Sequence, residues 1–228
     1  MFTPDAHYAG RDALRAEQDG DGGRIAHRES GTYVRLSALS TSEDPSRSEN
    51  HTTVLVIDMQ EASLVGCADV AGVISRINDL VERARQAGAG VVFVQHEDAD
   101  DPNMKAGAPG WQLAAGLARL DGDTVVHKTY RDSFADTDLA AVLTTSGTQR
   151  LVVTGLASEL CVQSTASSAL LHGYDVTLAS DAHTTVPAEL PGGRLDAEAI
   201  VAFVNRSFAT MRHPGRTVEV LRAADVSI

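Results

Sequence analysis

Short apolar runs rich in Val, Leu and Ile alternate with amphipathic segments of helical length from Thr52 onward. An alternation of this kind is typical of βαβ units. The runs are almost continuously apolar, which favours strands that are covered on both faces, as in parallel sheets. The predicted strands are residues 53–59, 90–96, 124–128, 150–156, 175–180 and 217–221.

Four helices are predicted between and after these strands. Apolar residues at spacings of three and four indicate a first helix that ends near Gly88 and a shorter second one that Gly147 closes. A third helix starts near Cys161 and stops at Gly173, and a fourth follows at residues 196–211. The pattern therefore predicts an α/β fold whose sheet is mainly parallel.

The first 50 residues differ from the rest. They contain the sequence DGDGG at residues 19–23, a Ser- and Thr-rich segment at 37–48, and little sustained periodicity. An alternating piece at 33–36 is compatible with a strand or a loop. We expect residues 1–50 to be a weakly structured or arm-like extension of one domain that spans residues 51–228.

Charge and hydropathy exclude several classes of partner. The 228 residues include 19 basic and 31 acidic ones, a formal net charge of -12, so the field of the protein repels a phosphate backbone and no nucleic acid partner is expected. The apolar runs are far shorter than the ~20 residues of a membrane span. The first residues lack the basic start and apolar core of a secretory signal. We therefore expect a cytoplasmic protein that does not bind membranes.

Reactive side chains collect where the predicted strands end. Asp58 closes the first strand, His96 the second and Lys128 the third, and Cys161 lies in the turn after the fourth. Ligands of open parallel sheets bind at the carboxyl ends of the strands, so these four side chains are expected at one edge. The other cysteine, Cys67, has no comparable setting and is expected to be a packed small side chain.

Each of these residues has a second interpretation. Free amide groups at a helix start favour negative charge, so Cys161 is predicted to become a thiolate nucleophile, and the same turn can direct amides at an oxyanion. The alternative is a small buried side chain. Asp58 is either a loop anchor or a desolvated functional group. Lys128 taken alone would be an ordinary solvated lysine.

Seven segments of the chain, taken in order, resemble the isochorismatase-like hydrolases. The resemblance covers residue 52 to about residue 220, and the ordered set is far more specific than any one segment. The segments are VIDMQ (56–60), VFVQH (92–96), PGWQL (109–113), VHK (126–128), VTGLASELCV (153–162), GYDV (173–176) and SDAH (180–183).

This resemblance implies a three-layer α/β/α fold, similar to the Rossmann-like folds, with a six-stranded and mainly parallel sheet. It implies that Cys161 attacks an amide carbon, that Asp58 takes and returns protons, and that Lys128 supports both. The backbone amides of Ala157 and Cys161 are then the oxyanion hole, and the peptide between Leu156 and Ala157 is expected to be cis. These roles meet the general requirement for a nucleophile with a base in reach.

Departures from the family pattern narrow the chemistry. Nicotinamidases of the family hold a metal with a histidine cluster after the second strand, whereas residues 96–101 here read HEDADD, so neither a metal nor another cofactor is expected. Members that cleave isochorismate can lack the cysteine, so Cys161 indicates a carbon–nitrogen bond as the target. The family is usually dimeric or larger, so a homodimer or higher homo-oligomer is expected.

Four further residues are candidates for substrate binding. Gln60 belongs to the first segment, Trp111 lies on a Gly-rich loop near the strand ends, and Tyr130 and Phe134 closely follow Lys128. Trp111 has the alternative of anchoring the following helix, and Tyr130 and Phe134 have the alternative of core packing.

The resemblance implies hydrolysis of an amide, lactam or carbamoyl bond in a small molecule through an acyl-enzyme. The net charge and the acidic run at 97–101 favour a cationic substrate through long-range steering. One branch of the family opens the lactam ring of streptothricin, a polycationic antibiotic. The alternatives are a carbamoyl or nicotinamide-type amidase and a catalytically idle member that acts as a binding module. His183 is a weaker acid–base candidate, because Asp58 and Lys128 already supply proton transfer.

Overall fold

The computed structural model describes residues 16–18, 24–26 and 51–228. The chain divides into two units, Met1–Ser48 and Glu49–Ile228. Within the first unit, β1 (Ala16–Gln18) and β2 (Arg24–Ala26) pair in an antiparallel ladder. The piece at 33–36 for which a strand was considered lies outside the described residues. The assignment of residues 1–50 as an extension stays a prediction.

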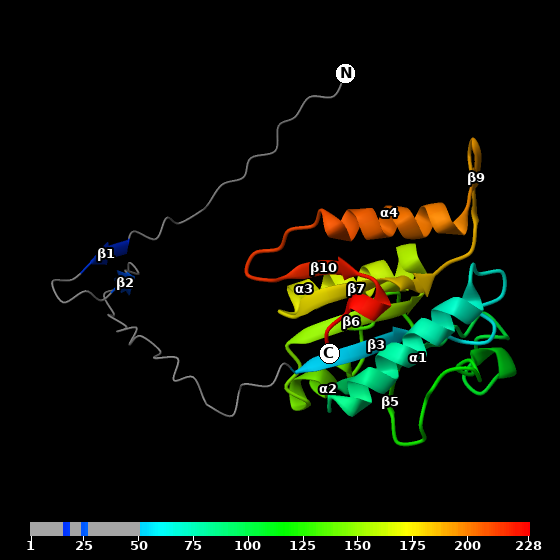
Figure 1. The fold of residues 1–228 in the computed structure, drawn as a ribbon, viewed down its shortest axis with the longest axis horizontal. Helices are drawn as coiled ribbons and strands as arrows, with labels where there is room; N and C mark the ends of the chain where they lie inside the picture. The colour runs from blue at the N-terminus through cyan, green and yellow to red at the C-terminus, as the bar shows by residue number, and fades with distance from the viewer. Residues whose placement is uncertain (1–15, 19–23, 27–50) are drawn as a thin grey trace. The chain divides into compact units, whose positions relative to one another are not determined.

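The second unit is built on a six-stranded sheet in the order β10-β7-β6-β3-β4-β5 (Figure 1). Every neighbouring pair in this sheet is parallel, which confirms the predicted class of sheet. The strands are β3 (Thr52–Ile57), β4 (Gly90–His96), β5 (Thr124–Lys128), β6 (Arg150–Leu156), β7 (Asp175–Thr184) and β10 (Val218–Leu221).

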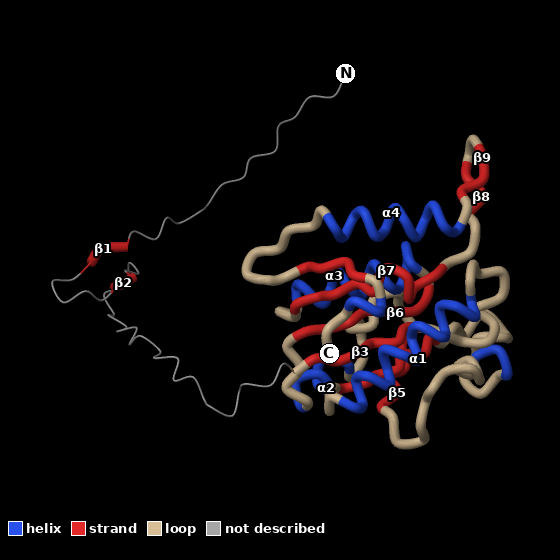
Figure 2. Tube along the Cα trace, viewed as in Figure 1, coloured by secondary structure: helices blue, strands red, loops and turns tan. Residues whose placement is uncertain are grey.

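Helices cover both faces of the sheet, as the three-layer prediction requires (Figure 2). The helix α1 (Val70–Gln86) packs on one face together with the short turn η4 (Ala223–Asp225). The other face is covered by α2 (Leu139–Thr145), α3 (Gln163–Leu171) and α4 (Ala197–Ala209). The predicted three-layer α/β/α arrangement is therefore confirmed.

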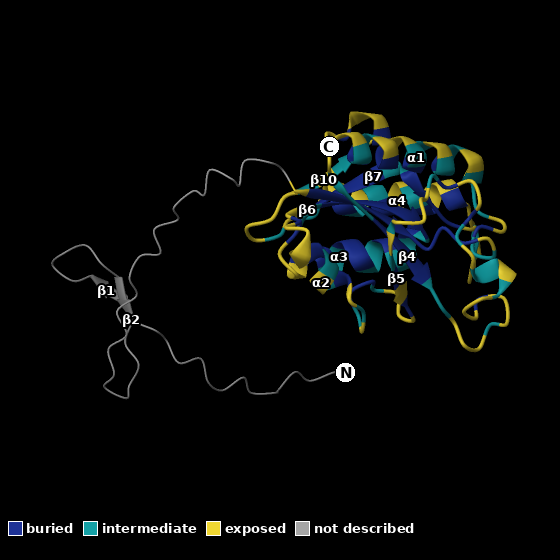
Figure 3. Cartoon of the chain, turned by 90° about the horizontal axis from the view of Figure 1, so that it is seen from below, coloured by how far each residue is buried: buried dark blue, intermediate teal, exposed yellow. Residues whose placement is uncertain are grey.

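The central strands are buried because both of their faces meet a helix layer (Figure 3). All six residues of β3 are buried, and alternate side chains enter the two apolar cores. Leu55 and Ile57 pack under α2 and α3, whereas Val54 and Val56 pack under α1. This two-sided burial explains why the strand is continuously apolar in the sequence.

Three strands, β4, β5 and β6, have the predicted bounds, and β7 does not. It continues to Thr184, because the pairing with β6 shifts register between Val153 and Gly155 and then resumes with His183 and Thr184. Residues 181–184 are mostly polar, so the pattern of hydrophobic residues did not predict this extension. The hairpin of β8 (Ala188–Leu190) and β9 (Gly193–Leu195) was also not predicted.

The described part of the chain contains no helix with the length and apolar character that crossing a membrane requires. Its connections include two further short turns, η2 (Pro109–Trp111) and η3 (Ser158–Val162), of which the second is a π-helical turn that leads into α3.

Candidate active site

Four candidate side chains meet at the carboxyl edge of the sheet, as predicted from the strand ends. Asp58 follows β3, the central strand that lies between β4 and β6. His96 ends β4 and pairs in register with Lys128, which ends β5. Cys161 lies in η3, directly after β6. The parallel order of the strands therefore brings together residues that are up to about a hundred positions apart.

Lys128 is the centre of the cluster. Its Nζ lies 2.7 Å from Asp58 Oδ2, and it donates hydrogen bonds to Cys161 Sγ at 3.3 Å, His96 Nδ1 at 3.3 Å and the carbonyl oxygen of Tyr130 at 3.1 Å. Lys128 and Asp58 are 2% and 4% exposed. A buried pair of opposite charges is stable only when hydrogen bonds surround it, and here Lys128 finds such acceptors on three sides.

Burial makes the Asp58 carboxylate a better proton acceptor. Desolvation raises the pKa of Asp58 above its ordinary value, and the charge and hydrogen bond of Lys128 oppose this effect. Asp58 Oδ1 is buried and accepts no conventional hydrogen bond from the described residues, while the Cys161 thiol is its neighbour. The free oxygen is therefore in place to accept the thiol proton.

The resting state of Cys161 differs from the sequence prediction of a thiolate. Burial and, to a smaller extent, the Asp58 carboxylate raise the pKa of Cys161, and Lys128 counteracts them only in part, so that the pKa is raised to about 12. The thiol lies within the π-helical turn rather than at the first turn of a regular helix, so the amides of a helix start do not dominate its environment. The raised pKa favours the neutral thiol, so Cys161 would need a base in reach to act as a nucleophile.

A cavity of about 290 Å³ opens in front of these residues. Most of its wall is apolar, and its ionisable lining side chains other than the two cysteines are Asp58, His96 and Arg131. Burial and the nearby Lys128 charge lower the pKa of His96, so its ring is neutral at pH 7. The lining residues are Asp58, Ser63, Cys67, His96, Arg131, Leu156, Ala157, Leu160, Cys161 and Val186.

Ala157 lines this cavity beside Cys161, and the peptide between Leu156 and Ala157 is cis, as the resemblance implied. Within the described residues, the Ala157 amide donates no backbone hydrogen bond, although its carbonyl accepts one from Leu160 and one from Val162. The oxyanion hole of Ala157 and Cys161 stays a prediction that this free amide supports.

Gly155 allows the strand ends to approach each other at the site. Its φ is +112°, and a Cβ at this position would lie 2.1 Å from the carbonyl oxygen of Ile57 and 2.6 Å from its nitrogen. Asp58 itself adopts a positive φ of 51° directly after Ile57. A glycine is therefore required where β6 pairs with the end of β3, next to the turn that carries Asp58.

Gln60 and Trp111, both candidates for substrate binding, lie outside the cavity lining. The buried Gln60 amide donates to the carbonyl oxygens of His96 and Trp111 and accepts from the His96 amide. Trp111 stacks on His127, with ring centroids 5.4 Å apart. Both residues connect the loops behind the site, and Gln60 holds the end of β4 in position.

Tyr130 and Phe134 also lie elsewhere. Tyr130 is 57% exposed and meets the site only through the carbonyl that Lys128 binds. Phe134 packs in the core beneath α3 and stacks on His172 and Tyr174, which agrees with the core-packing interpretation.

His183 belongs to a buried network rather than to the cavity. Its Nδ1 lies 2.7 Å from Ser158 Oγ and its Nε2 lies 3.0 Å from Asn205 Oδ1. Burial lowers the pKa of His183, so the ring is neutral at pH 7. This arrangement fixes the turn that carries Cys161.

Arg131 and Leu160 were not singled out from the sequence, although both line the cavity. The available signal was distance along the chain, because Arg131 follows Lys128 by three residues and Leu160 precedes Cys161. Among the described residues, no group of three or more His, Cys, Asp or Glu side chains is arranged to hold a metal ion.

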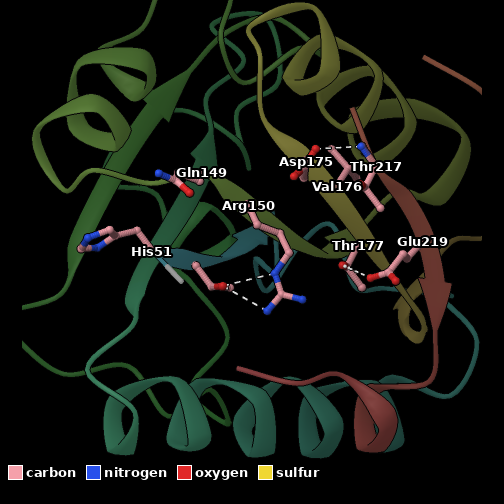
Figure 4. Close-up of a pocket in the computed structure, with 9 residues that line it drawn as sticks. His51, Gln149, Arg150, Asp175, Val176, Thr177, Thr217 and Glu219 are labelled. Atoms are coloured by element: carbon pink, nitrogen blue, oxygen red, sulfur yellow. Dashed lines mark hydrogen bonds between the residues drawn. The ribbon is translucent and has the colours of Figure 1, made fainter. Parts of the chain in front are cut away.

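A different cavity, of about 210 Å³, lies at the amino edge of the same sheet (Figure 4). Its polar groups bind one another: Arg150 donates to Thr52 Oγ1, Thr177 donates to Glu219, and the Thr217 amide donates to Asp175. It holds neither a cysteine nor a buried ion pair.

Known proteins match this chain in sequence and in fold. The isochorismatase domain model matches residues 52–196. A streptothricin hydrolase of Streptomyces noursei is 36% identical over 173 residues, which are 73% of this chain and 69% of that protein. A ureidoacrylate amidohydrolase of Caulobacter vibrioides is 31% identical over 171 residues, covering 58% of this chain and 76% of the relative.

A solved isochorismatase structure from Pseudomonas putida matches with a TM-score of 0.68 and 25% identity, over 78% of this chain and 91% of that one. The extent of the domain match and the 36% identity to a relative covered over two thirds of its length confirm the resemblance noted in the sequence. The chain belongs to the isochorismatase family of hydrolases.

Proposed function

We propose that this protein hydrolyses a carbon–nitrogen bond of a small amide or lactam through a thioester on Cys161, and that a streptothricin-class lactam is its substrate. The observation that carries the chemistry is the contact network in which Lys128 binds both Asp58 and Cys161, two residues that line one cavity. The 36% identity to a streptothricin hydrolase supports the choice of substrate.

The reaction begins with a proton transfer from Cys161 Sγ to Asp58. The sulfur then attacks the carbonyl carbon, and the negative charge on oxygen is bound by the amides of Ala157 and Cys161. As the carbon–nitrogen bond breaks, the nitrogen takes the proton from Asp58. In a lactam, the amine that forms stays attached to the rest of the molecule.

Water completes the cycle. Asp58 accepts a proton from the water that attacks the thioester, the carbon–sulfur bond breaks, and the thiolate recovers the proton. Lys128 stabilises the negative charge that alternates between Asp58 and Cys161, because its Nζ contacts both. Each group therefore returns to its starting state without a further reactant.

The test is to incubate purified protein with streptothricin and to follow the lactam by mass spectrometry. We expect the antibiotic to gain the mass of one water without release of ammonia, and Cys161→Ser to abolish this change. Rapid quenching should trap an acyl adduct on the peptide that contains Cys161. An intact lactam after prolonged incubation with folded protein would refute the proposed substrate.

A linear amide is the second candidate, supported by the 31% identity to a ureidoacrylate amidohydrolase. A panel of carbamoyl compounds and primary amides, nicotinamide included, distinguishes the two, because they release ammonia whereas a lactam does not. If the protein formed no adduct with any of these lactams and amides, the third candidate function, that of a catalytically idle binding module, would be favoured. The cytoplasmic location, the homo-oligomer and the arm-like residues 1–50 remain predictions for the full protein.

A further inference from the structure

A second cavity, of about 360 Å³, adjoins the catalytic one on the side of α3. The two cavities share Arg131 and Leu160 in their walls, so they lie next to each other on either side of these side chains. The remaining wall is formed by Asp132, Glu159 and one face of α3. We call this space the α3 cavity.

The face of α3 that lines this cavity is unusually hydrophilic. Ser164, Ser167 and Ser168 are spaced by three and four residues, so their side chains lie on one face of the helix, and all three are half-buried. In the described residues, none of their hydroxyls forms a hydrogen bond with the protein. By contrast, the hydroxyls of Thr144 and Ser146 at the end of α2 donate to carbonyls four residues earlier. The α3 hydroxyls are thus available to a ligand.

Charged groups and free hydroxyls line the α3 cavity together. Asp132 supplies a carboxylate and Arg131 supplies a guanidinium, which forms no ion pair within the described residues. Asp132 Oδ1 accepts from the Phe134 amide, so this carboxylate is already oriented by the protein. The Glu159 carboxylate is not available to a ligand, because its Oε1 accepts from Thr185 and its Oε2 is buried. One carboxylate, one guanidinium and three free hydroxyls match a ligand that carries several hydroxyl groups.

The two cavities therefore differ in what they accept. The catalytic cavity is mostly apolar around Cys161, which suits the compact amide or lactam ring, whereas the wall of the α3 cavity is as polar as it is apolar. We propose that the α3 cavity is a second substrate subsite, which binds a hydroxyl-bearing group attached to the scissile amide or lactam. This inference rests on the proposed function, since it assigns the non-reacting part of the same substrate.

The test fills the α3 cavity and compares two substrates. Ser167→Met places a long side chain among the three serines, and Ser207→Met makes the same change on a half-buried position of α4, outside the site. The substrates are a simple piperidinone lactam and the same lactam carrying a glucosamine substituent. Loss of two hydrogen bonds corresponds to a decrease in kcat/KM of about tenfold or more.

We expect Ser167→Met to raise KM for the glucosamine-bearing lactam while kcat/KM for the simple lactam stays unchanged, and Ser207→Met to affect neither. An equal decrease for both substrates, or no decrease for either, would overturn the proposal. A change of mass in solution caused by Ser167→Met would also overturn it, because this face would then be covered by a second copy of the chain.

Direct binding separates this inference from the proposed function. With Cys161→Ser as the background, glucosamine alone is added and backbone amide shifts of α3 are recorded by NMR. Shifts at Ser164, Ser167 and Ser168 that disappear in the Ser167→Met double variant support the subsite even if no lactam is hydrolysed. Hydrolysis of the simple lactam by the unaltered protein, together with no shift on α3 in the Cys161→Ser protein, would refute the subsite and leave the proposed function intact.

Discussion

The carboxyl edge and the amino edge of the six-stranded sheet both carry acidic and basic side chains, but these side chains are buried and paired in different ways. At the carboxyl edge, Asp58 and Lys128 are buried against each other and against a thiol. At the amino edge, Arg150 and Glu219 bind threonine hydroxyls (Figure 4). Arg150 also donates to the carbonyl of Ser227. Both edges have a cavity, but only one has a nucleophile beside a base.

The difference shows that burial and incomplete pairing give these groups their chemistry. The polar side chains at the amino edge form hydrogen bonds with one another, and none of them places a proton donor beside a buried free carboxylate oxygen. At the carboxyl edge, Asp58 keeps one oxygen without a conventional hydrogen bond, and its pKa is raised by desolvation. A charged cavity is therefore a weaker indication of catalysis than a buried group with one unused acceptor.

The largest expected effect comes from removing the nucleophile. Cys161→Ser should lower the rate of amide or lactam hydrolysis by at least ~10³-fold, because a hydroxyl is a much weaker nucleophile with the same base. At the amino edge, Glu219→Gln should leave the rate within about twofold, as surface changes away from a site usually do. Comparable losses at both edges would show that the assignment of the catalytic edge is mistaken.

The next largest effect is expected at Asp58, where one substitution should change the rate of hydrolysis and the rate of Cys161 alkylation in opposite directions. Asp58→Asn removes the base and should reduce hydrolysis by ~10²–10⁴-fold. The same change removes the carboxylate that raises the pKa of Cys161, so the thiolate fraction at neutral pH and the rate of alkylation by iodoacetamide should both increase. The measurement is the pH profile of alkylation, followed on the Cys161 peptide by mass spectrometry.

Asp79→Asn, on the exposed face of α1, is the matched control and should change neither rate. Slower alkylation in Asp58→Asn would contradict the role of Asp58 in holding the thiol protonated. Wild-type alkylation that is already complete well below the ordinary thiol pKa would contradict it as well, since the resting thiol would then be a thiolate.

A stability effect of intermediate size is expected at Gly155. An alanine there must adopt a positive φ and places its Cβ within 2.1 Å of the Ile57 carbonyl oxygen. Strain and overpacking together should lower the free energy of unfolding by ~2–4 kcal/mol, measured from urea denaturation. Gly122→Ala is the control, because its added Cβ meets nothing within 4 Å, and this change should stay within ~0.5 kcal/mol.

Much of the fold could be predicted from the sequence. Strands such as β3 and β6 are buried on both faces, so they appear in the sequence as continuous apolar runs. The carboxyl-edge rule then located Asp58, Lys128 and Cys161 without any coordinates, and the structure places them in contact. The end of β7 and the β8–β9 hairpin were missed for the same reason, since their residues are polar or exposed.

The walls of the cavity were harder to predict than its floor. Gln60 and Phe134 lie close to candidate catalytic residues in sequence, and Trp111 lies on the connection between β4 and β5. The side chains of all three nevertheless make loop contacts or pack in the core. Side-chain direction depends on backbone geometry after the strands end, and no periodic pattern records it. The protonated state of Cys161 depends likewise on burial and on Asp58, which are properties of the folded protein.

The smallest effect concerns the pH dependence of stability. Buried His183 has a lowered pKa in the native state, whereas in the unfolded chain it titrates near its ordinary value of 6.5. As pH falls through 6.5, the unfolded chain binds a proton that native His183 does not, so stability should decrease by at most ~1.4 kcal/mol per pH unit from this residue. Above that pH the contribution is fully present.

His183→Gln should reduce this slope between neutral and acidic pH, although it also lowers stability at pH 7 by disturbing the bonds to Ser158 and Asn205. His51→Gln, at an exposed position of the amino edge, is the matched change. Urea denaturation at several pH values measures the slope of each variant. Equal slopes in the two variants would contradict the prediction, because native His183 would then bind a proton as readily as the unfolded chain does, and its burial beneath Cys161 would not govern its titration.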